Sequence, residues 1–463
     1  MVFSSITFLF YFLPIVLGIY YIVPNKLKNI VLLLASIVFY FYGEPKYVLI
    51  MLVSIICTYL FGILIDKYKK YSKLFLILSI CVVTGILIYF KYMNFIIENI
   101  NLWLTNKIDF IYVILPIGIS FYTFQLISYI IDVYRGNAKV QKNILKLAMY
   151  VSLFPQLIAG PIVRYTTIEE QLENREYSFE KFALGVRRFI IGLGKKVLIA
   201  NVLGELTSIF LSSNDRSILF YWIYGVSNML QIYFDFSGYS DMAIGLGKMF
   251  GFEFLENFNY PYIATSITDF WRRWHISLSS WFRDYIYIPL GGNRVSKIKW
   301  IRNILIVWLL TGLWHGAAWN FILWGLYFGI ILIIEKVFLN VNKNLPKIPT
   351  ILSRIYVLSI VMISFIIFSG ENMEQIMQNI VGLVGYGGQP LSSPESIYYF
   401  KSYFVVLLIA VIGATPILKN VANSEKFHKI TNTLEPIYLF LILVICTSYI
   451  IDGSFNPFLY FRF

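Results

Sequence analysis

Apolar stretches long enough to cross a lipid bilayer recur from one end of this chain to the other. A helix needs ~20 such residues to span a hydrocarbon core of about 30 Å. The 463 residues are 58% hydrophobic and only 14% charged, with a mean hydropathy of +0.71, whereas a soluble domain carries far more charge. The sequence therefore predicts an all-α, polytopic integral membrane protein, organised as one membrane-embedded domain over residues 1–463.

The N-terminal stretch and the three cysteines are both typical of a membrane protein. The N-terminal stretch MVFSSITFLFYFLPIVLGIYYIVP lacks the basic start and the small-residue cleavage site of a signal peptide, so we expect a retained first span. Cys57, Cys81 and Cys446 all lie inside apolar runs, and we expect neither a disulfide framework nor a metal site from them.

The arrangement of Lys and Arg predicts the orientation. Ten runs have the length of full crossings: 4–22, 28–43, 47–65, 74–92, 110–133, 197–212, 217–247, 351–369, 402–418 and 434–451. With the N-terminus outside, most of the 38 Lys and Arg residues fall in the inner segments, as the positive-inside rule requires. Both termini are therefore expected to be extracellular, and the net charge of +13 indicates orientation rather than nucleic-acid binding.

Two further apolar runs have basic segments at both ends. The run 303–335 contains TGLWHGAAWN and is short for two crossings, so we expect a re-entrant element that turns near Gly312 and Gly316. The run 147–163, LAMYVSLFPQLIAGPIV, is interrupted by two prolines and a glycine and is expected to behave similarly. Non-helical backbone at that depth is tolerated only where it is buried in protein or lines a watery cavity.

His315 lies inside the first of these runs and is therefore expected to face an internal cavity. An ionisable residue at membrane depth indicates a functional site, although a polar contact between helices is the simpler alternative. Neutral imidazole accepts a proton near neutral pH, which suits a general base.

His275 lies in DFWRRWHISLSSWFRDYIYIPLGGNR, residues 269–294, where aromatic and Arg residues alternate. Anchoring at the membrane–water boundary accounts for most of that pattern. It does not account for the polar residues of the segment, which leaves a site role and an anchoring role both open. These residues are Asp269, His275, Ser277, Ser279, Ser280 and Asp284. The third histidine, His428, lies among lysines and is expected to be solvated and idle.

Residues 231–247, QIYFDFSGYSDMAIGLG, place two carboxylates in an apolar span. Asp235 and Asp241 are six residues apart and do not share a helical face, so structural hydrogen bonding is at least as good an interpretation as a metal or proton relay. Nearby glycines would allow close helix approach. Nucleotide-binding loops, CxxC pairs and HExxH motifs do not occur, and no metal site is expected.

Five blocks of the chain resemble the membrane-bound O-acyltransferase (MBOAT) family, in particular its alginate O-acetyltransferase-like bacterial branch. The blocks are SFYTFQLISYIIDVYRG (120–136), FPQLIAGPIVRY (154–165), QIYFDFSGYSDMAIGLGKMFGF (231–252), ENFNYPYIATSITDFWRRWHISLSSWFRDYIYIPLGGNR (256–294) and TGLWHGAAWNFILWGLYFG (311–329). A similar ending, NPFLYFRF, occupies 456–463. The motif-bearing core is about 110–335.

The resemblance implies an MBOAT-type core with about ten crossings, re-entrant helices and a central tunnel, in a multi-pass protein of the cell membrane. It also implies an acetyltransferase that moves acetyl from cytosolic acetyl-CoA to hydroxyls of an extracytoplasmic polysaccharide, with no permanently bound cofactor. The W-H-G histidine of the family falls on His315, and the R-W-H-x-S histidine of its bacterial branch falls on His275. Such enzymes usually act with a secreted or membrane-anchored partner.

We expect His315 to take the hydroxyl proton, apolar walls at Trp314, Trp319 and Trp324 to exclude water, and His275 to hold the donor or orient His315. Coenzyme A carries phosphates, so some of the nearby basic residues are candidates for binding it. They are Arg272, Arg273, Arg283, Arg164, Lys195 and Lys196.

The acceptor stays open between an alginate-like exopolysaccharide and peptidoglycan. A composition rich in Ile, Lys, Asn and Tyr is typical of an AT-rich genome and favours peptidoglycan or another wall glycan as the acceptor. The alternatives are D-alanyl transfer to teichoic acid, a carrier of lipid-linked saccharides, and a structural scaffold. No internal repeats support the carrier, and the scaffold gives His315 no role.

Overall fold

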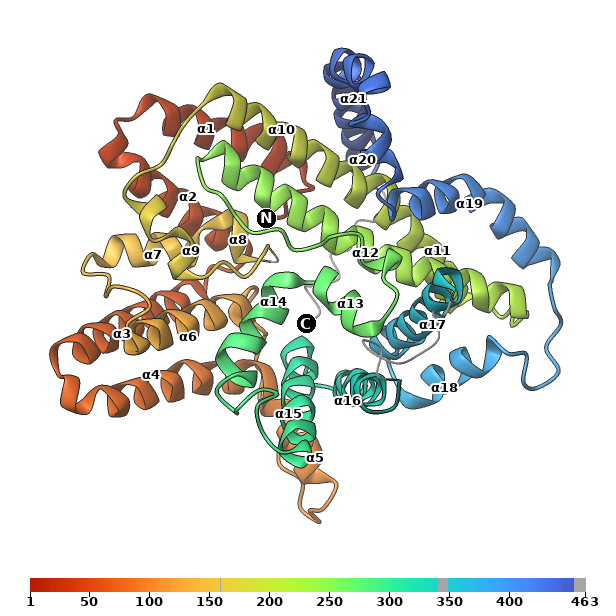
Figure 1. Cartoon of the computed structure of the whole chain (residues 1–463), viewed down its shortest axis with the longest axis horizontal. Helices are drawn as coiled ribbons and strands as arrows, with labels where there is room; N and C mark the ends of the chain where they lie inside the picture. The colour runs from red at the N-terminus through yellow and green to blue at the C-terminus, as the bar shows by residue number, and fades with distance from the viewer. Residues whose placement is uncertain (159, 340–348, 454–463) are drawn as a thin grey trace. The chain divides into compact units, whose positions relative to one another are not determined.

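The computed structural model describes residues 1–158, 160–339 and 349–453, and within these ranges every regular element is helical (Figure 1). The all-α architecture is therefore confirmed, whereas the C-terminal block NPFLYFRF lies outside the described residues. Two compact units can be distinguished. The first contains Met1–Phe189 and Ser240–Leu255, and the second contains Ile190–Tyr239 and Glu256–Phe463. The expectation that residues 1–463 act as one membrane domain stays a prediction.

The first unit is built from nine helices of its own. They are α1 (Leu13–Ile22), α2 (Asn25–Gly43), α3 (Val48–Lys67), α4 (Ser72–Leu87), α5 (Met93–Asn101), α6 (Ile119–Arg135), α7 (Ile144–Ser152), α8 (Phe154–Leu157) and α9 (Tyr165–Ile168). Two further helices, α10 (Phe179–Gly194) and α12 (Ile218–Met249), continue from one unit into the other along the chain.

The second unit holds the remaining helices. They are α11 (Asn201–Ser212), α13 (Ile267–Arg273), α14 (Ile276–Phe282), α15 (Lys297–His315), α16 (Trp319–Ile334), α17 (Thr350–Ser369), α18 (Met373–Gly382), α19 (Pro394–Gly413), α20 (Ile417–Ala422) and α21 (Glu425–Ile451). Wider π-helical turns extend several helices, at Thr7–Phe12, Ile88–Tyr92, Lys195–Ala200, Arg283–Tyr287 and Glu335–Leu339.

Seven helical stretches of the described residues are long and apolar enough to cross a membrane, so the chain is a multi-pass membrane protein. They are Asn25–Gly43, Val48–Lys67, Lys69–Asn101, Trp319–Val337, Thr350–Ser369, Pro394–Gly413 and Ile430–Ile451. Six of them correspond to runs that the sequence predicts as crossings, and Thr7–Ile22 is a shorter apolar helix. The number of crossings and the orientation of the termini stay predictions.

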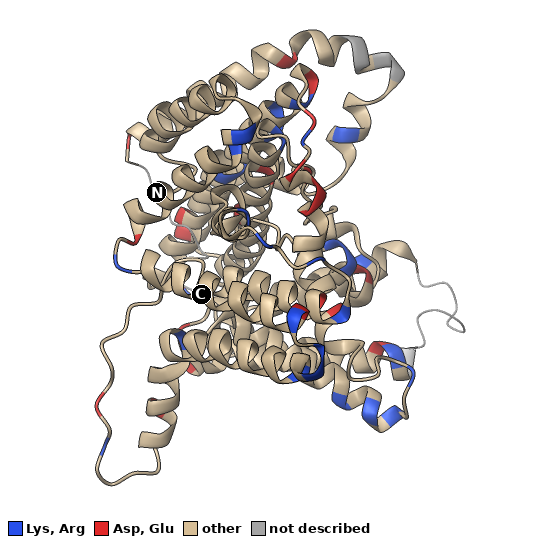
Figure 2. Cartoon of the chain, turned by 90° about the vertical axis from the view of Figure 1, so that its left-hand side faces the viewer, with Lys and Arg blue, Asp and Glu red and all other residues tan. Residues whose placement is uncertain are grey.

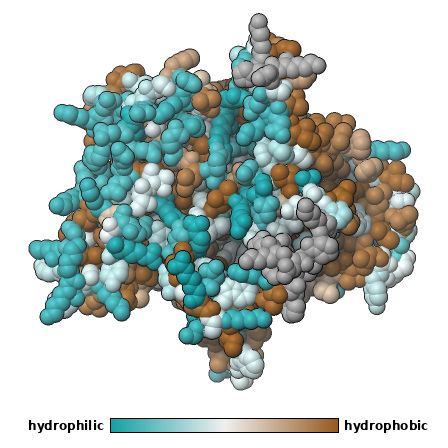
Figure 3. All heavy atoms as spheres, viewed as in Figure 1, coloured by the Kyte–Doolittle hydropathy of each residue, from teal (hydrophilic) through white to brown (hydrophobic). Residues whose placement is uncertain are grey.

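The distribution of side chains fits a lipid environment. In Figure 2 the middles of most helices carry no charge, and Lys, Arg, Asp and Glu concentrate at helix ends and in loops. Helix α19 exposes a row of hydrophobic residues, among them Tyr398 and Val405, each 63% exposed, and Figure 3 shows hydrophobic side chains gathered on this part of the surface. An apolar surface of this size is stable only against lipid or another protein.

The predicted crossing at 110–133 is only partly helical. Residues 110–115 form no regular structure, and α6 starts after Gly118, whose φ of 75° is left-handed and unfavourable for other residues. The same conformation at Gly136, with φ of 76°, ends the helix. The sequence prediction overlooked that Pro116 and Gly118 divide the apolar run.

The predicted interruption of 147–163 is present in the first unit. Helix α7 ends at Ser152, and the short α8 carries Pro155 in its first turn, where a missing backbone N–H has no cost. The chain then folds back, because the Tyr150 hydroxyl donates to the Val163 carbonyl at 2.9 Å and the Gln156 amide donates to the Tyr150 carbonyl.

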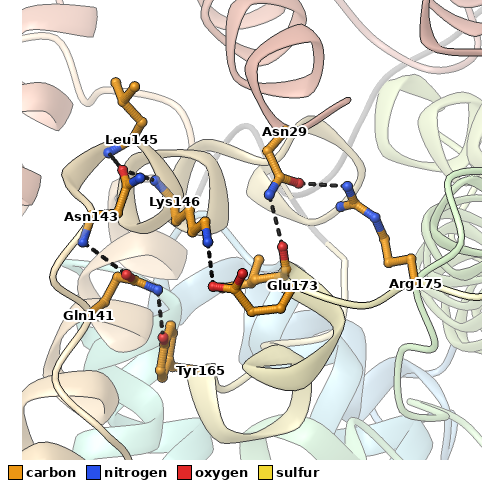
Figure 4. Close-up of polar contacts among 9 residues, drawn as sticks. Asn29, Gln141, Asn143, Leu145, Lys146, Tyr165, Glu173 and Arg175 are labelled. Atoms are coloured by element: carbon orange, nitrogen blue, oxygen red, sulfur yellow. Dashed lines mark hydrogen bonds and ion pairs between the residues drawn. The ribbon is translucent and has the colours of Figure 1, made fainter. Parts of the chain in front are cut away.

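Polar contacts hold the loops of the first unit around α7 (Figure 4). The Asn143 side chain caps the helix by accepting from the backbone of Leu145 at 2.9 Å. Lys146 pairs with Glu173. Arg175 donates to Asn29 at 2.6 Å. These contacts anchor the segment before α10 to α2 and α7.

Helices α15 and α16 form a hairpin in the second unit, and the chain reverses between Gly316 and Ala318, close to the predicted turn. A Cβ atom on Gly312 would lie 2.3 Å from the Phe321 carbonyl oxygen, so only glycine permits this approach. The hairpin is longer than the predicted 303–335 because α15 already begins at Lys297. Lys and Arg are good helix formers, so the basic segment continues the helix instead of ending it.

Candidate active site

His315 is the last residue of α15, where the hairpin turns. Its imidazole is 4% exposed and is enclosed by aromatic rings of the second unit. The ring centroids of Trp324 and Phe368 lie 4.9 and 5.2 Å from the His315 centroid, both nearly perpendicular to it, and Trp314 lies at 4.9 Å. The imidazole is therefore held in an apolar enclosure.

Two of the three tryptophans that the sequence predicts as walls of this enclosure contact His315. Trp314 and Trp324 do so, whereas Trp319, at the start of α16, is 56% exposed. The sequence analysis missed Phe368, which comes from α17 and packs on His315 and on Phe321 at 5.1 Å. No motif marks Phe368, because it lies on a later helix, 39 residues beyond the end of the TGLWHGAAWNFILWGLYFG block at position 329.

His275 lies at the break between α13 and α14, also in the second unit. Its side chain is fully buried, so it is not a simple interfacial anchor. Its backbone is left-handed, with φ of 44°, which costs a residue with a Cβ about 1–2 kcal/mol. Strain of this kind persists only where the surroundings impose it.

Polar contacts around His275 impose its left-handed backbone conformation. The Nδ1 atom lies 3.1 Å from Oδ1 of Asn257, and that oxygen also accepts from the Ser277 backbone and hydroxyl at 3.2 and 2.8 Å. Burial lowers the pKa of His275, which lies outside the seven candidate spans, to about 3. The imidazole is therefore neutral at physiological pH.

The indole of Trp314 contacts both histidines. Its centroid is 4.9 Å from that of His315 and 5.8 Å from that of His275, and Phe236 of α12 covers His275 at 4.6 Å with perpendicular rings. The structure thus brings together the two imidazoles that the sequence singles out, around one tryptophan and within one compact unit.

Glu335, at the end of α16, anchors the segment that carries His275. Its buried carboxylate accepts from the backbone N–H groups of Ile267 and Thr268 at 2.6 and 3.0 Å, and from the Thr268 hydroxyl at 3.0 Å. Tyr356 of α17 donates to the same carboxylate at 3.3 Å. A carboxylate at this position satisfies amides at the start of α13 that have no partner within the helix. The sequence analysis missed this residue.

A pocket of about 410 Å³ opens between α13 and α14. It is lined by Thr268, Trp271, Arg272, Ile276, Ser279, Ser280 and Arg283. Of the six basic residues that the sequence proposes for the donor, Arg272 and Arg283 line this pocket. Arg273 does not, and its guanidinium donates to both carboxylate oxygens of Asp269 at 3.0 Å.

The two carboxylates of α12 each form an ion pair with a basic side chain. In the second unit Asp235 pairs with Lys196, both side chains being 2% exposed, and in the first unit Asp241 accepts from Arg188 at 2.8 Å. These contacts fit the structural interpretation, and Lys196 has its charge compensated within the protein. Among residues 1–158, 160–339 and 349–453, no cluster of three His, Cys, Asp or Glu side chains could hold a metal ion.

The fold and the paired histidines can now be compared with known proteins. Residues 34–372 match the membrane-bound O-acyltransferase (MBOAT) family. This match covers most of the chain, so the protein belongs to that family and is an O-acyltransferase of the membrane.

Individual relatives are similar over most or all of the chain. The chain is 38% identical to the probable alginate O-acetylase AlgI of Azotobacter vinelandii, over 100% of both chains. It is 43% identical to the protein of the same name from Pseudomonas aeruginosa, over 85% of this chain and 76% of the relative. It is 33% identical to the peptidoglycan O-acetyltransferase of Helicobacter pylori, over 100% of this chain and 98% of the relative.

Proposed function

We propose that the protein transfers acetyl groups from acetyl-CoA, taken from the cytosolic side, to hydroxyls of an extracytoplasmic polysaccharide. The observation that carries this proposal is the pair of buried imidazoles, His315 and His275, that contact one indole in the core of an O-acyltransferase. The full-length similarity to O-acetyltransferases supports acetyl as the transferred group.

In the proposed reaction the acceptor hydroxyl oxygen attacks the thioester carbonyl carbon while His315 takes the hydroxyl proton. The carbon–sulfur bond then breaks, and the proton passes from His315 to the departing thiolate, which gives the acetyl ester and free coenzyme A. The rings of Trp324 and Phe368 keep bulk water from His315. The central tunnel through which the two substrates would meet stays a prediction.

His275 acts differently in this proposal. It is neutral and fully buried, and it shares Trp314 with His315, so it orients the reacting groups and holds the donor. We assign the donor phosphates to the pocket beside it, where Arg272 and Arg283 present guanidinium groups and Ser279 and Ser280 present hydroxyls. Arg273 does not line this pocket and is not assigned to the donor.

The acceptor that we propose is an alginate-like exopolysaccharide or peptidoglycan, in keeping with the names of the relatives that match from end to end. A secreted or membrane-anchored acetyltransferase partner would complete the transfer outside the membrane. Mass analysis of wall and secreted glycans from cells with and without the protein would identify the acceptor by the loss of its O-acetyl groups.

The central test uses membranes that contain the protein and radiolabelled acetyl-CoA. His315→Ala should reduce transfer of label to glycan by a factor of about 10² or more, the usual contribution of a positioned general base. His428→Ala is the control, since this histidine, whose side chain lies outside the described residues, is expected to be idle. Transfer by His315→Ala at the level of the control would remove His315 from the chemistry.

A further inference from the structure

The hydrogen bonds of Asn257 determine which nitrogen of His275 is available. We infer that Asn257 is a positioning residue that fixes His275 as the tautomer with hydrogen on Nδ1, so that Nε2 accepts a hydrogen bond from a substrate donor, such as a hydroxyl or an amide N–H. The inference deepens the proposed function and rests on the role given there to His275.

The first step is the identity of the Asn257 atom that faces Nδ1. The same atom lies 3.2 Å from the Ser277 backbone nitrogen, which can only donate. It is therefore the amide oxygen, and the Ser277 hydroxyl donates to it as well, at 2.8 Å. An oxygen of this kind has no hydrogen to give, so the 3.1 Å contact with His275 forms when Nδ1 is protonated.

The second step is the rigidity of this arrangement. The Asn257 carbonyl accepts from the Ile276 backbone at 3.0 Å, and the Asn259 backbone donates to the Arg273 carbonyl at 2.9 Å. These two bonds hold the segment 257–259 along the break between α13 and α14, on both sides of His275. They impose the left-handed backbone of His275 and keep its ring in register with the Asn257 amide.

The third step is the state of the other ring nitrogen. Nε2 of His275 is buried and has no hydrogen-bond partner among the residues that the structure describes. With Nδ1 protonated, Nε2 carries a lone pair, and a buried acceptor without a donor costs about 1–3 kcal/mol. Such a cost is retained where a ligand supplies the missing donor, which assigns Nε2 to a donor group of the substrate.

The ring and hydrogen-bond contacts of the His275 imidazole within the described part of the chain are all with uncharged side chains. They are Phe236 of α12, Trp314 of α15, Asn257 and Ser277. Burial is the cause of the lowered pKa of His275. The ring therefore stays a neutral acceptor over the pH range in which transfer would be assayed.

Nitrogen NMR tests the tautomer directly on the full-length protein in detergent or nanodiscs. The chain has three histidines, so ¹⁵N-histidine labelling gives few signals, and those missing in His275→Ala belong to His275. We expect a protonated Nδ1 and an unprotonated Nε2 at pH 7. A protonated Nε2 in the wild-type protein overturns the inference, and this measurement does not require any Asn257 variant to fold.

Substitution of Asn257 tests the consequence. Asn257→Leu removes the acceptor for Nδ1 and should reduce acetyl transfer about 10–100-fold, the usual effect of removing a group that orients a functional histidine. Asn257→Asp keeps an acceptor and should retain Nδ1–H and more activity than Asn257→Leu. Asn228→Leu is the matched control, since Asn228 is also buried in the same unit but donates to the Phe365 carbonyl.

The pH profile separates positioning from a merely structural role. A carboxylate beside Nδ1–H stabilises the imidazolium, so Asn257→Asp should raise the pKa of His275 and move the acid limb of transfer to higher pH. An unmoved limb, together with equal loss in Asn257→Leu and Asn228→Leu, overturns the inference. Full activity of His275→Ala would instead contradict the proposed role of His275, and the NMR measurement would still decide the tautomer.

Discussion

The two buried histidines are held by different means. His275 directly precedes α14 in a strained, left-handed conformation and is fixed by the hydrogen bonds of Asn257. His315 ends the long, regular α15 and is enclosed by the rings of Trp324 and Phe368. Polar contacts determine the orientation of the first, and packing determines the surroundings of the second.

The difference indicates a division of labour. A hydrogen-bonded imidazole with a fixed tautomer is suited to orient a substrate, because its accepting nitrogen points in one direction. An imidazole enclosed by aromatic rings is shielded from bulk water, which suits a base that takes a proton beside a thioester. The two sites should therefore respond differently to the same substitutions.

The largest difference is expected from alanine and glycine at each histidine. All four variants should lower acetyl transfer by a factor of about 10² or more. Their stabilities should rank in opposite order. At 275 the glycine variant should unfold at a higher temperature than the alanine variant, because φ of 44° suits glycine. At 315, the last residue of a helix, the alanine variant should be the more stable, by at most about 1 kcal/mol. Thermal unfolding in detergent measures both, and the same order at both sites would contradict the comparison.

Phe368→Ala should act on the His315 side of the site. Loss of a buried phenylalanine lowers the free energy of unfolding by about 3–5 kcal/mol, and the cavity beside His315 admits water. The ratio of free acetate to glycan-bound acetyl should therefore rise in an assay with radiolabelled acetyl-CoA. Phe210→Ala is the control, since Phe210 is also buried but stacks on Tyr224. An equal rise in both variants would show that the enclosure has no special role.

Glu335→Ala should act on the His275 side. The variant leaves the Ile267 and Thr268 amides without their acceptor, which should lower the free energy of unfolding by about 1–3 kcal/mol for each amide that stays buried. We expect KM for acetyl-CoA to rise more than kcat falls, because Thr268 lines the pocket of Arg272. The exposed Glu371 supplies the control substitution. A fall in kcat with unchanged KM would place Glu335 outside donor binding.

The smallest effect is a pH dependence of stability. In the folded protein burial lowers the pKa of His275 from 6.5 to about 3, whereas the unfolded chain takes up a proton below pH 6.5. This histidine therefore makes the protein less stable as the pH falls from 6.5 toward 3. His275→Asn should be less sensitive to acid than the wild type in thermal unfolding at pH 7 and pH 5. Identical acid sensitivity would indicate that His275 is not the group responsible.

Much of the fold follows from local patterns that the sequence displays. Apolar runs predict most of the helices, and the turn of the hairpin follows from glycines near His315. The ends of the helices are less predictable from hydropathy. Helix α15 already begins at Lys297, within a basic segment, and α6 begins only after Gly118, because of the backbone conformation of that glycine.

The site is predictable only in part. Both histidines lie in recognisable motifs, and ionisable residues among apolar and aromatic neighbours are rare in membrane proteins. Asn257, Glu335 and Phe368 reach them from segments 18, 68 and 53 positions away from the residues that they contact, through pairings that only the tertiary fold creates. The sequence also could not show that Arg272 lines the pocket whereas Arg273 does not. The pairing of Arg273 with Asp269 depends on the direction of both side chains.

The position of His315 at the end of α15 has an electrostatic consequence. The peptide dipoles of a helix add up to a partial negative charge at its carboxyl end, which stabilises a nearby cation by about 0.3–1 kcal/mol or more in a buried setting. When His315 takes up a proton it becomes a cation at this end of a 19-residue helix. The backbone of α15 would thus favour the charge distribution of the transition state over that of the resting enzyme, with no acidic side chain required.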